Sequence, residues 1–407
     1  MPTEDRVNCI TPPYLLEKLI ESDDLAVRDA ALRTLVVSAE QRGLREATPW
    51  SSRDITPEGG RRTIFNTQHQ ETLAVAKVAR SEGQGPVRDP SINRAYDGLG
   101  TTRQFYADVF DRDSIDGFGM RLDGYVHFSE GYNNAYWDGR RMVFGDGDGR
   151  VFSDLTGSLD VIGHELTHGV TQSTAGLIYH NQSGALNESI SDVFGSLIKQ
   201  WSAKQTAADA DWLIGAEVFT PGVGADALRS MKAPGTAYNN ALMGKDPQPG
   251  HMKDYRALPD TAKGDNGGVH LNSGIPNHAF YLAATAIGGN AWAAPGHIWY
   301  ESLKATGSTA QFQDFAETTV AKAAQLYGTG GAEHRAVQSA WEQVGIRVAG
   351  LLTRSLEASS DDSLAEMSQR IEELAAQVKA LTALIRAGAT DVKSANTGRK
   401  AKARADV

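Results

Sequence analysis

Two histidines one helical turn apart constrain this chain more than any other feature. His164 and His168 lie in the run LDVIGHELTHGV, whose apolar residues recur with the period of an amphipathic helix. A spacing of four residues places both imidazoles on one face, where they can bind a single ion. Nitrogen ligands of this kind favour zinc. The alternative is a helix whose two histidines only make hydrogen bonds, and other residues must decide between the two.

A third ligand should follow, because a catalytic zinc takes three protein ligands and leaves one position for water. Glu188, in GALNESISDVFGSL, lies 20 residues after His168 on a second predicted helix. Alone it could equally be a solvated helix charge, but the two histidines favour its role as a ligand. Asp192 lies one turn later on the same face. We expect Asp192 and Asn187 to accept the far N–H groups of the ligand imidazoles.

Composition limits the classes of partner. The 407 residues are 41% hydrophobic and 22% charged, which is ample for two or three globular domains. The net charge is -10 and basic residues cluster only near the C-terminus, so we expect no nucleic-acid partner. No apolar run reaches the length of a membrane span, so we expect no membrane partner.

The N-terminus, MPTEDRVNCITPPYLLEKLIES, carries neither the basic segment nor the continuous apolar segment of a Sec signal peptide. We therefore expect synthesis in the cytoplasm and, for action as a secreted protein, export by a leaderless route. The single cysteine, Cys9, excludes an intramolecular disulfide.

Residues 1–60 are predicted to form a small helical domain and a linker. Two short helices are expected within residues 14–45. The sequence EATPWSSRDITPEGGRRTIFN then combines Pro, Gly, Ser and paired Arg, which is typical of an exposed segment that proteases cut. We expect the second helix to present one apolar face, made of Leu25, Ala31, Leu32, Leu35 and Val36.

The chain then divides into two lobes. In residues 61–157 short β-type runs are broken by Gly and Asp, which predicts a β-rich lobe. Residues 158–347 predict an α-helical lobe, so the fold class is α+β, with the HELTH helix at the junction, where clefts tend to form. Helices are expected at 159–172, 184–204, 270–287, 291–305, 311–327 and 331–345.

The stretch VIGHELTHGVTQSTAGLIYHNQSGALNESISDVFG closely resembles the zinc-binding core of the thermolysin-like neutral metallopeptidases. Similar blocks follow the same order, so that the resemblance covers most of residues 62–347. It implies a two-lobed fold with one catalytic zinc ion in the cleft, and hydrolysis of internal bonds of protein or peptide substrates on the N-terminal side of bulky hydrophobic residues. The further blocks are NNAYWDGRRMVFGDGDG, DWLIGAEVFTPG, ALRSM and DNGGVHLNSGIPNHAFY.

Four residues are candidates for the chemical steps. Glu165 adjoins a ligand histidine but is not needed as a ligand, so it can act as general base toward a zinc-activated water and pass the proton to the leaving amine. The resemblance implies that His270 and Tyr179 stabilise the oxyanion, with Asp265 orienting His270. The alternative for His270 is a buried structural histidine.

The resemblance also implies the residues that bind substrate. Asn134 and Ala135 match the strand that pairs with the substrate backbone. Arg229 matches the arginine that binds the substrate carbonyl beyond the cleavage point. The specificity pocket, apolar enough to favour Leu-like or Phe-like side chains, is expected to comprise Phe152, Leu155, Val161, Ile214, Val218 and Leu228.

One departure from the family pattern concerns calcium. Relatives that bind a calcium pair beside the zinc helix use a cluster of carboxylates, of which Asp160 and Asp211 are present here. A lysine that pairs with both could replace the ions, so we expect the double calcium site to be lost. Other calcium positions stay open, since Asp226 and neighbouring carbonyls remain. The positions that lack the expected acid are Lys199, Leu213 and Ala216.

The stretch CITPPYLL at residues 9–16 and the short first domain resemble the protealysin-type branch of the family. The resemblance implies that this domain is an inhibitory propeptide, so that the chain is a zymogen, and we expect its removal by a cut between Glu46 and Arg62. Cys9 could ligate zinc as a thiolate. Alternatively it is a small buried residue that holds the propeptide on the catalytic domain.

Residues 348–407 extend beyond the resemblance. In LAEMSQRIEELAAQVKALTALI, apolar residues alternate at spacings of three and four, which predicts a coiled coil and a homo-oligomer. A single amphipathic helix that docks on the protease is the alternative. The last residues, KSANTGRKAKARADV, form a polar, basic tail. The apolar positions are Leu364, Met367, Ile371, Leu374, Val378, Leu381 and Ile385.

Two classes of function follow from these observations. The chain is either an active endopeptidase or a zinc-binding scaffold that has lost catalysis and acts through its coiled coil. The presence of Glu165, Tyr179 and His270 together favours the endopeptidase.

Overall fold

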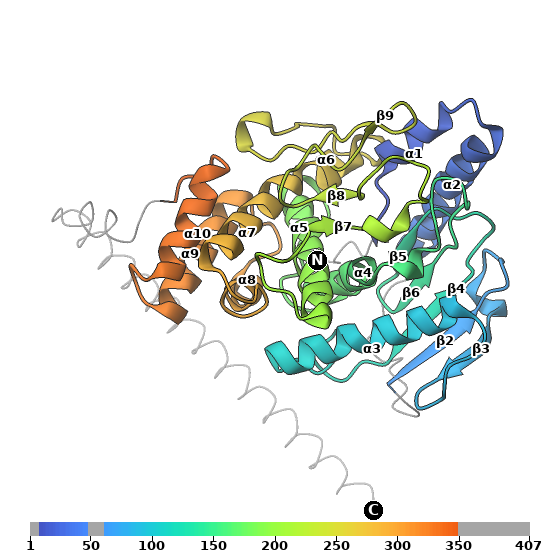
Figure 1. Ribbon diagram of the computed structural model, residues 1–407, viewed down its shortest axis with the longest axis horizontal. Helices are drawn as coiled ribbons and strands as arrows, with labels where there is room; N and C mark the ends of the chain where they lie inside the picture. The colour runs from blue at the N-terminus through green and yellow to red at the C-terminus, as the bar shows by residue number, and fades with distance from the viewer. Residues whose placement is uncertain (1–7, 48–60, 349–407) are drawn as a thin grey trace, which may run out of the picture. The chain divides into compact units, whose positions relative to one another are not determined.

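A six-stranded mixed sheet forms the centre of the β-rich lobe (Figure 1). The computed structural model describes residues 8–47 and 61–348. The strand order is β1-β5-β6-β4-β2-β3, in which β2, β4 and β6 are parallel neighbours and the other pairs are antiparallel. The strands are β1 (Asn8–Cys9), β2 (Arg62–Asn66), β3 (Lys77–Ser81), β4 (Leu122–Val126), β5 (Ala135–Trp137) and β6 (Arg141–Phe144).

One long helix in the β-rich lobe was not predicted from the sequence. Helix α3 (Pro90–Phe110) crosses from β3 to β4 and packs on β2 and β4. It contains two glycines, which have low helix propensity and weakened the periodic signal. Gly98 is required by packing: a Cβ there would lie 2.4 Å from Cδ1 of Ile162 on the zinc helix. Tertiary contact therefore overrides local propensity.

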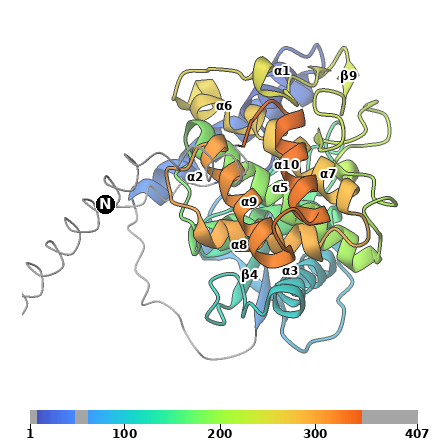
Figure 2. The ribbon, with the colours of Figure 1, turned by 90° about the vertical axis from the view of Figure 1, so that its left-hand side faces the viewer.

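The second lobe is helical, as predicted. The zinc helix α4 spans the predicted residues, whereas the expected helix at 270–287 is divided into α6 and α7 at Ser273. Helices α7, α8, α9 and α10 gather at one side of this lobe (Figure 1), the side that faces the viewer in Figure 2. The helices are α4 (Leu159–Gln172), α5 (Asn181–Ala203), α6 (Asp265–Asn272), α7 (Gly274–Ile287), α8 (Ala294–Ala305), α9 (Phe312–Tyr327) and α10 (Ala332–Gln343).

Irregular chain with two short antiparallel strand pairs connects α5 to α6. Strands β7 (Leu213–Ile214) and β8 (Arg229–Ser230) pair with each other, as do β9 (Asn239–Asn240) and β10 (Gly244–Lys245). The β7–β8 pair positions Ile214 and Arg229 beside each other in register. The described helices include none that is long and apolar enough to cross a membrane.

The N-terminal segment forms two helices, α1 (Pro13–Ile20) and α2 (Leu25–Ala47), which pack on each other. The predicted apolar face of α2 is wrong for Leu25, Leu32 and Val36, whose side chains are about half exposed or more. The side that is buried instead carries small and hydroxyl residues, because it contacts polar groups of the β-rich lobe. Its buried members are Val27, Ala30, Ala31, Thr34, Val37 and Ser38.

Two predictions fall outside the described residues. They are the cut in the linker, of which residues 48–60 are not described, and the coiled coil of residues 348–407, of which only Val348 is described.

Candidate active site

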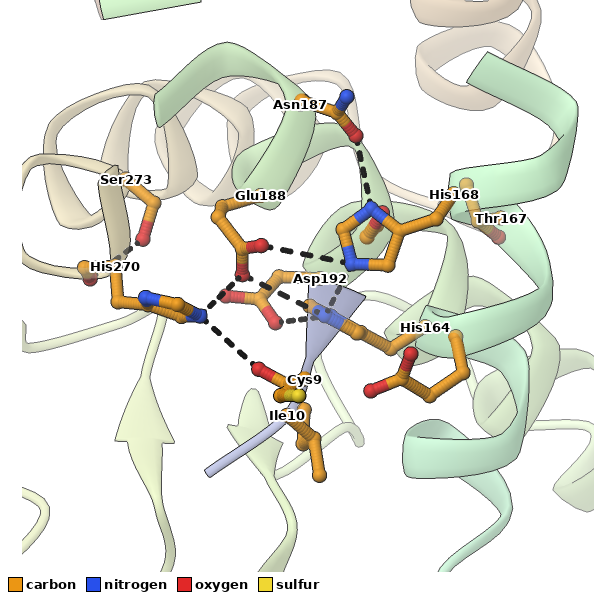
Figure 3. A network of polar contacts seen from close by, with 12 residues as sticks. Cys9, Ile10, His164, Thr167, His168, Asn187, Glu188, Asp192, His270 and Ser273 are labelled. Atoms are coloured by element: carbon orange, nitrogen blue, oxygen red, sulfur yellow. Dashed lines mark hydrogen bonds and ion pairs between the residues drawn. The ribbon is translucent and has the colours of Figure 1, made fainter. Parts of the chain in front are cut away.

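Helices α4 and α5 bring the three predicted zinc ligands together in the protein interior (Figure 3). His164 and His168 project from α4 with their Nε2 atoms 3.1 Å apart. Glu188 projects from α5, with its Oε2 3.5 Å from His164 Nε2 and its Oε1 3.5 Å from His168 Nε2. All three side chains are buried. These spacings match the roughly 3.3 Å that separates ligand atoms around one tetrahedral zinc ion.

The far nitrogens of both rings are occupied. Nδ1 of His164 lies 2.8 Å from Asp192 Oδ1, and Nδ1 of His168 lies 2.8 Å from Asn187 Oδ1. When each Nδ1–H donates, a neutral ring presents its lone pair at Nε2. Two lone pairs then converge with the Glu188 carboxylate, whose Oε2 has no hydrogen-bond partner among the described residues. A divalent cation satisfies all three groups, so the residues fit zinc.

Asp192 does more than orient His164. It accepts two hydrogen bonds of 2.8 Å from the guanidinium of Arg229 and another of 2.8 Å from Asn277 Nδ2. Burial alone would raise the pKa of Asp192, but Arg229 outweighs it and holds the pKa well below the usual range. Asp192 is therefore a carboxylate that couples His164 on α4 to Arg229 on β8. The sequence carried no signal for the contribution of Asn277.

Glu165 lies on α4 beside His164, and only one of its two carboxylate oxygens accepts a hydrogen bond from the described residues. Its Oε2 accepts a 2.9 Å hydrogen bond from the Trp137 backbone, and its Oε1 has no partner among the described residues. Burial and the nearby Glu188 carboxylate raise the pKa of Glu165 well above its usual value. A carboxyl group in this setting has a high proton affinity, as a general base requires.

Tyr179 and His270 face the ligands from the opposite side of the cleft. The Tyr179 hydroxyl donates to Glu188 and lies 3.2 Å from His270 Nε2. Asp265 accepts from the backbone of His270 at 2.9 Å and contacts its Nδ1 at 2.6 Å. Burial would lower the pKa of His270, but Glu188 and Asp265 outweigh it and raise the pKa to about 9. A charged His270 can donate from both nitrogens.

A turn in α6 makes the double contact with Asp265 possible. Four consecutive residues from Asp265 to Gly268 have positive φ, which reverses the chain before the regular helix begins. At Gly267 a Cβ would lie 2.2 Å from Asn181 Oδ1, so this position requires glycine.

The N-terminal segment occupies the cleft as an extended strand. β1 is antiparallel to β5, and the backbone N–H of Ile10 donates to Ala135 O at 3.3 Å. Cys9 O accepts from His270 Nε2 at 3.0 Å, and Ile10 O accepts from Arg229 Nη1 at 3.1 Å (Figure 3 shows Cys9, Ile10 and His270). The residues predicted to bind a substrate backbone therefore bind this strand.

The next contact extends the same pattern. The backbone N–H of Thr11 donates to Asn134 Oδ1 at 3.0 Å. Ile10 is completely buried and belongs to the same apolar cluster as the predicted specificity pocket. The pocket residues Phe152, Leu155, Val161, Ile214, Val218 and Leu228 are all buried in that cluster. Ile10 carried no signal of its own in the sequence, although Thr11, directly before Pro12, is predisposed to an extended backbone.

Cys9 directs its carbonyl group, rather than its sulfur, to His270. Its side chain is buried in a small apolar cluster with Val37 of α2 and Tyr132. Burial raises the pKa of the Cys9 thiol to about 12, which disfavours a thiolate. These observations favour the second sequence interpretation, a small buried residue that holds the N-terminal domain in place.

At the far end of α5, Lys199 pairs with both retained acids of the calcium pattern. Its Nζ lies 3.1 Å from Asp160 and 3.1 Å from Asp211. Glu217, which the sequence analysis did not include, lies 3.9 Å away. Burial would lower the pKa of Lys199, but the three carboxylates outweigh it and raise the pKa above its usual value. The lysine thus occupies the position predicted for it.

Comparison with known proteins identifies the class. Residues 63–172 match the catalytic domain of thermolysin metallopeptidases, and residues 175–346 match their alpha-helical domain. The chain therefore belongs to the thermolysin family of metallopeptidases, which confirms the predicted family, the two-lobed fold and the assignment as a peptidase.

Individual relatives match between 61% and 83% of the chain. The chain is 45% identical over 341 residues to an extracellular metalloprotease of Pectobacterium carotovorum, covering 83% of this chain and 96% of the relative. It is 41% identical over 258 residues to a thermolysin of Alicyclobacillus acidocaldarius, covering 61% and 44%. The solved structure of the precursor of protealysin, a metalloproteinase from Serratia proteamaculans, superimposes with a TM-score of 0.75 at 49% identity, covering 83% and 99%.

Proposed function

We propose that this metallopeptidase is a zinc-dependent endopeptidase that cuts on the N-terminal side of bulky hydrophobic residues. The observation that carries the proposal is the position of the Cys9–Ile10 peptide bond. The carbonyl oxygen of this bond, Cys9 O, accepts from His270, and the next carbonyl oxygen, Ile10 O, accepts from Arg229. The side chain that follows the bond, that of Ile10, is buried among apolar residues. A substrate bound in the same way would place a hydrophobic residue where Ile10 lies.

The metal is assigned to His164, His168 and Glu188. When bound, zinc supplies a Lewis acid that polarises the substrate carbonyl and lowers the pKa of water toward about 7. Glu165 Oε1 takes the proton from the attacking water and delivers it to the leaving amine. Glu165 Oε2 stays fixed by the Trp137 N–H, so the acceptor atom is defined.

The other residues hold the substrate and receive the developing charge. Tyr179 and His270 donate to the oxygen of the attacked carbonyl, and Asp265 keeps His270 oriented and charged. Asn134 and Ala135 align the substrate backbone, as they align residues 10 and 11 in the precursor. Arg229 binds the next carbonyl and is itself fixed by Asp192.

Residues 8–47 act in this proposal as an intramolecular inhibitor. Their first strand fills the substrate position, and α2 adds contacts through Thr34 and Ser38, which bond to Asn133 N at 3.0 Å and to the Tyr132 hydroxyl at 2.8 Å. The related structure is named as a precursor, which supports a zymogen. A cut between Glu46 and Arg62 would detach the inhibitor.

Two further parts of the proposal concern the lysine site and association. The double calcium site is replaced by Lys199, and the apolar repeat in the sequence of residues 348–407 associates copies of the chain. The first rests on the ion pairs of Lys199. The second rests on the sequence.

The decisive experiment uses the full chain before and after a cut in the linker. We expect the cut protein to hydrolyse casein, a zinc chelator to abolish the activity, and peptides with Leu or Phe after the scissile bond to be preferred over peptides with Asp. N-terminal sequencing should locate the new terminus between residues 46 and 62. Activity that survives complete zinc removal, or an active species that begins at Met1, would contradict the proposal.

A further inference from the structure

A second group of potential metal ligands lies at the edge of the β-rich lobe. β2, β4 and β6 are parallel neighbours, so their carboxyl ends meet at one edge of the sheet. His127 follows β4 directly, Asp146 lies two residues after β6, and His69 lies three residues after β2. The topology therefore gathers two imidazoles and a carboxylate that are far apart in the sequence.

The distances resemble those of the catalytic group. His127 Nδ1 lies 2.9 Å from each oxygen of Asp146, and His69 Nδ1 lies 3.4 Å from Asp146 Oδ2. One ligand atom from each of the three residues lies within 4.8 Å of the others. In the catalytic group the corresponding separations are 3.1 and 3.5 Å. Small side-chain rotations suffice to accommodate one ion between the three residues.

A fourth residue orients the central histidine. Asp89, which caps the N-terminus of α3, has its Oδ2 2.8 Å from His127 Nε2. This leaves Nδ1 as the nitrogen that faces Asp146 and His69. The same arrangement, with the nitrogens exchanged, holds His164, whose Nδ1 contacts Asp192. A carboxylate that fixes the far nitrogen is the usual support of a metal-bound histidine.

The loops that carry the three residues are tied together. His69 N donates to His127 O at 2.8 Å, and Phe128 N donates to Phe144 O at 3.1 Å. His69 and His127 both adopt left-handed backbone conformations, with φ of 61° and 57°. Such conformations persist only where surrounding contacts hold them. The imidazoles are thus presented by loops of defined geometry.

We propose that His69, His127 and Asp146 bind a second zinc ion, distinct from the catalytic one. Two nitrogens and one carboxylate oxygen are ligands that zinc accepts, and the exposure of His69, whose side chain is 56% exposed, leaves room for water at the remaining position. The ion would also balance the charges of Asp146, beside it, and of Asp89, on the far side of the His127 ring, because two positive charges offset two carboxylates.

Asp146 and Asp89 hold His127 from both sides, through its two ring nitrogens. The bound ion links the ends of three strands and the loop that leads to β5, the strand that pairs with residues 8–9.

The test counts zinc in four versions of the full chain. After metal is stripped, zinc alone is titrated at pH 7.5 with equilibrium dialysis and metal analysis. We expect two ions for the wild type, one for His69→Asn, one for His168→Ala and none for the double variant. Asparagine is chosen because it tolerates the left-handed backbone of residue 69. His278→Ala, a half-buried histidine of α7, is the matched control and should bind two.

The outcomes separate this site from the proposed catalytic one. If His69→Asn binds as much zinc as wild type, and the double variant binds as much as His168→Ala, the second site does not exist. His127 then only forms ion pairs with Asp89 and Asp146. If His168→Ala loses no zinc, the catalytic assignment fails while the second site stands. Casein hydrolysis by linker-cut His69→Asn should equal that of wild type and so report an intact fold.

A second readout uses thermal unfolding in the His168→Ala background. Added zinc should raise the melting temperature, because it binds the folded state through residues that only folding brings together. His69→Asn or Asp146→Asn should abolish that rise. A zinc-dependent rise that persists in both variants would overturn the assignment.

Discussion

The two ends of the α4–α5 helix pair neutralise buried carboxylates in different ways. At one end Glu188 and Asp192 face His164, His168 and Arg229, and the ligand atoms converge on a position that needs a cation from solution. At the other end Asp160 faces Lys199, a cation that belongs to the chain. A bound ion can keep an open position for chemistry, whereas a lysine only balances charge. The metal end can therefore act on a substrate, and the lysine end stabilises the scaffold.

The largest effect should come from the base at the metal end. We expect Glu165→Ala to lower the rate of casein hydrolysis by the linker-cut protein at least ~10²-fold, because it removes the proton acceptor and leaves the three ligands in place. Metal analysis should show the zinc content of wild type. Glu217→Ala removes a carboxylate at the lysine end and is the control that should keep its activity. Near-wild-type activity of Glu165→Ala at full zinc occupancy would remove Glu165 from the mechanism.

The next largest effect should come from residues 9–11, which lie at the metal end of the helix pair. Ile10→Asp places a carboxylate in an apolar pocket, which should weaken the hold of residues 8–47 and raise the activity of the uncut chain roughly tenfold or more. Cys9→Ser keeps the backbone contacts with His270 and β5, so it should remain latent. The measurement is peptide hydrolysis by uncut protein. Full activation by Cys9→Ser, with Ile10→Asp still latent, would favour the thiolate interpretation of Cys9.

At the lysine end, Lys199→Ala should lower the free energy of unfolding by about 3 kcal/mol, the lower end of the range for breaking a buried ion pair. Asp160 would be left without its cation, although Ser158 Oγ at 2.5 Å and Gly215 N at 3.2 Å still donate to it. Asp211 is half exposed and can be solvated. Urea unfolding measures the change, and exposed Lys232→Ala should stay within about 0.5 kcal/mol of wild type. Equal losses in both variants would mean that Lys199 is an ordinary surface charge.

The smallest effect should follow from selective removal of calcium. With Lys199 in place, we expect no calcium ion at this position, so a calcium chelator should shift the melting temperature of wild type by no more than about 1 °C. In a protein of this size such a shift corresponds to a change of less than about 0.5 kcal/mol in the free energy of unfolding. Repeating the melt after adding calcium provides the control. A fall of many degrees, with Lys199→Ala melting like wild type, would show that a divalent ion rather than the lysine neutralises Asp160 and Asp211.

The sequence by itself determined the features that depend on local spacing. The spacing of four residues from His164 to His168 places both on one helical face, and the spacing of four from Glu188 to Asp192 does the same, because helical geometry is fixed over such short distances. The same reasoning placed α4 at its observed residues. The ion pairs of Lys199 with Asp160 and Asp211 were also predictable, because a positive charge stands where the family pattern has an acid.

Only the tertiary structure decided which segments meet. It buried the small and hydroxyl side of α2, formed α3 despite its glycines, brought Asn277 to Asp192, and laid residues 9–11 along β5 and Asn134 with Ile10 buried in the main apolar core. It also gathered His69, His127 and Asp146 at one sheet edge. These contacts join residues that are distant in the chain, and their energies depend on packing and desolvation, which no local periodicity encodes.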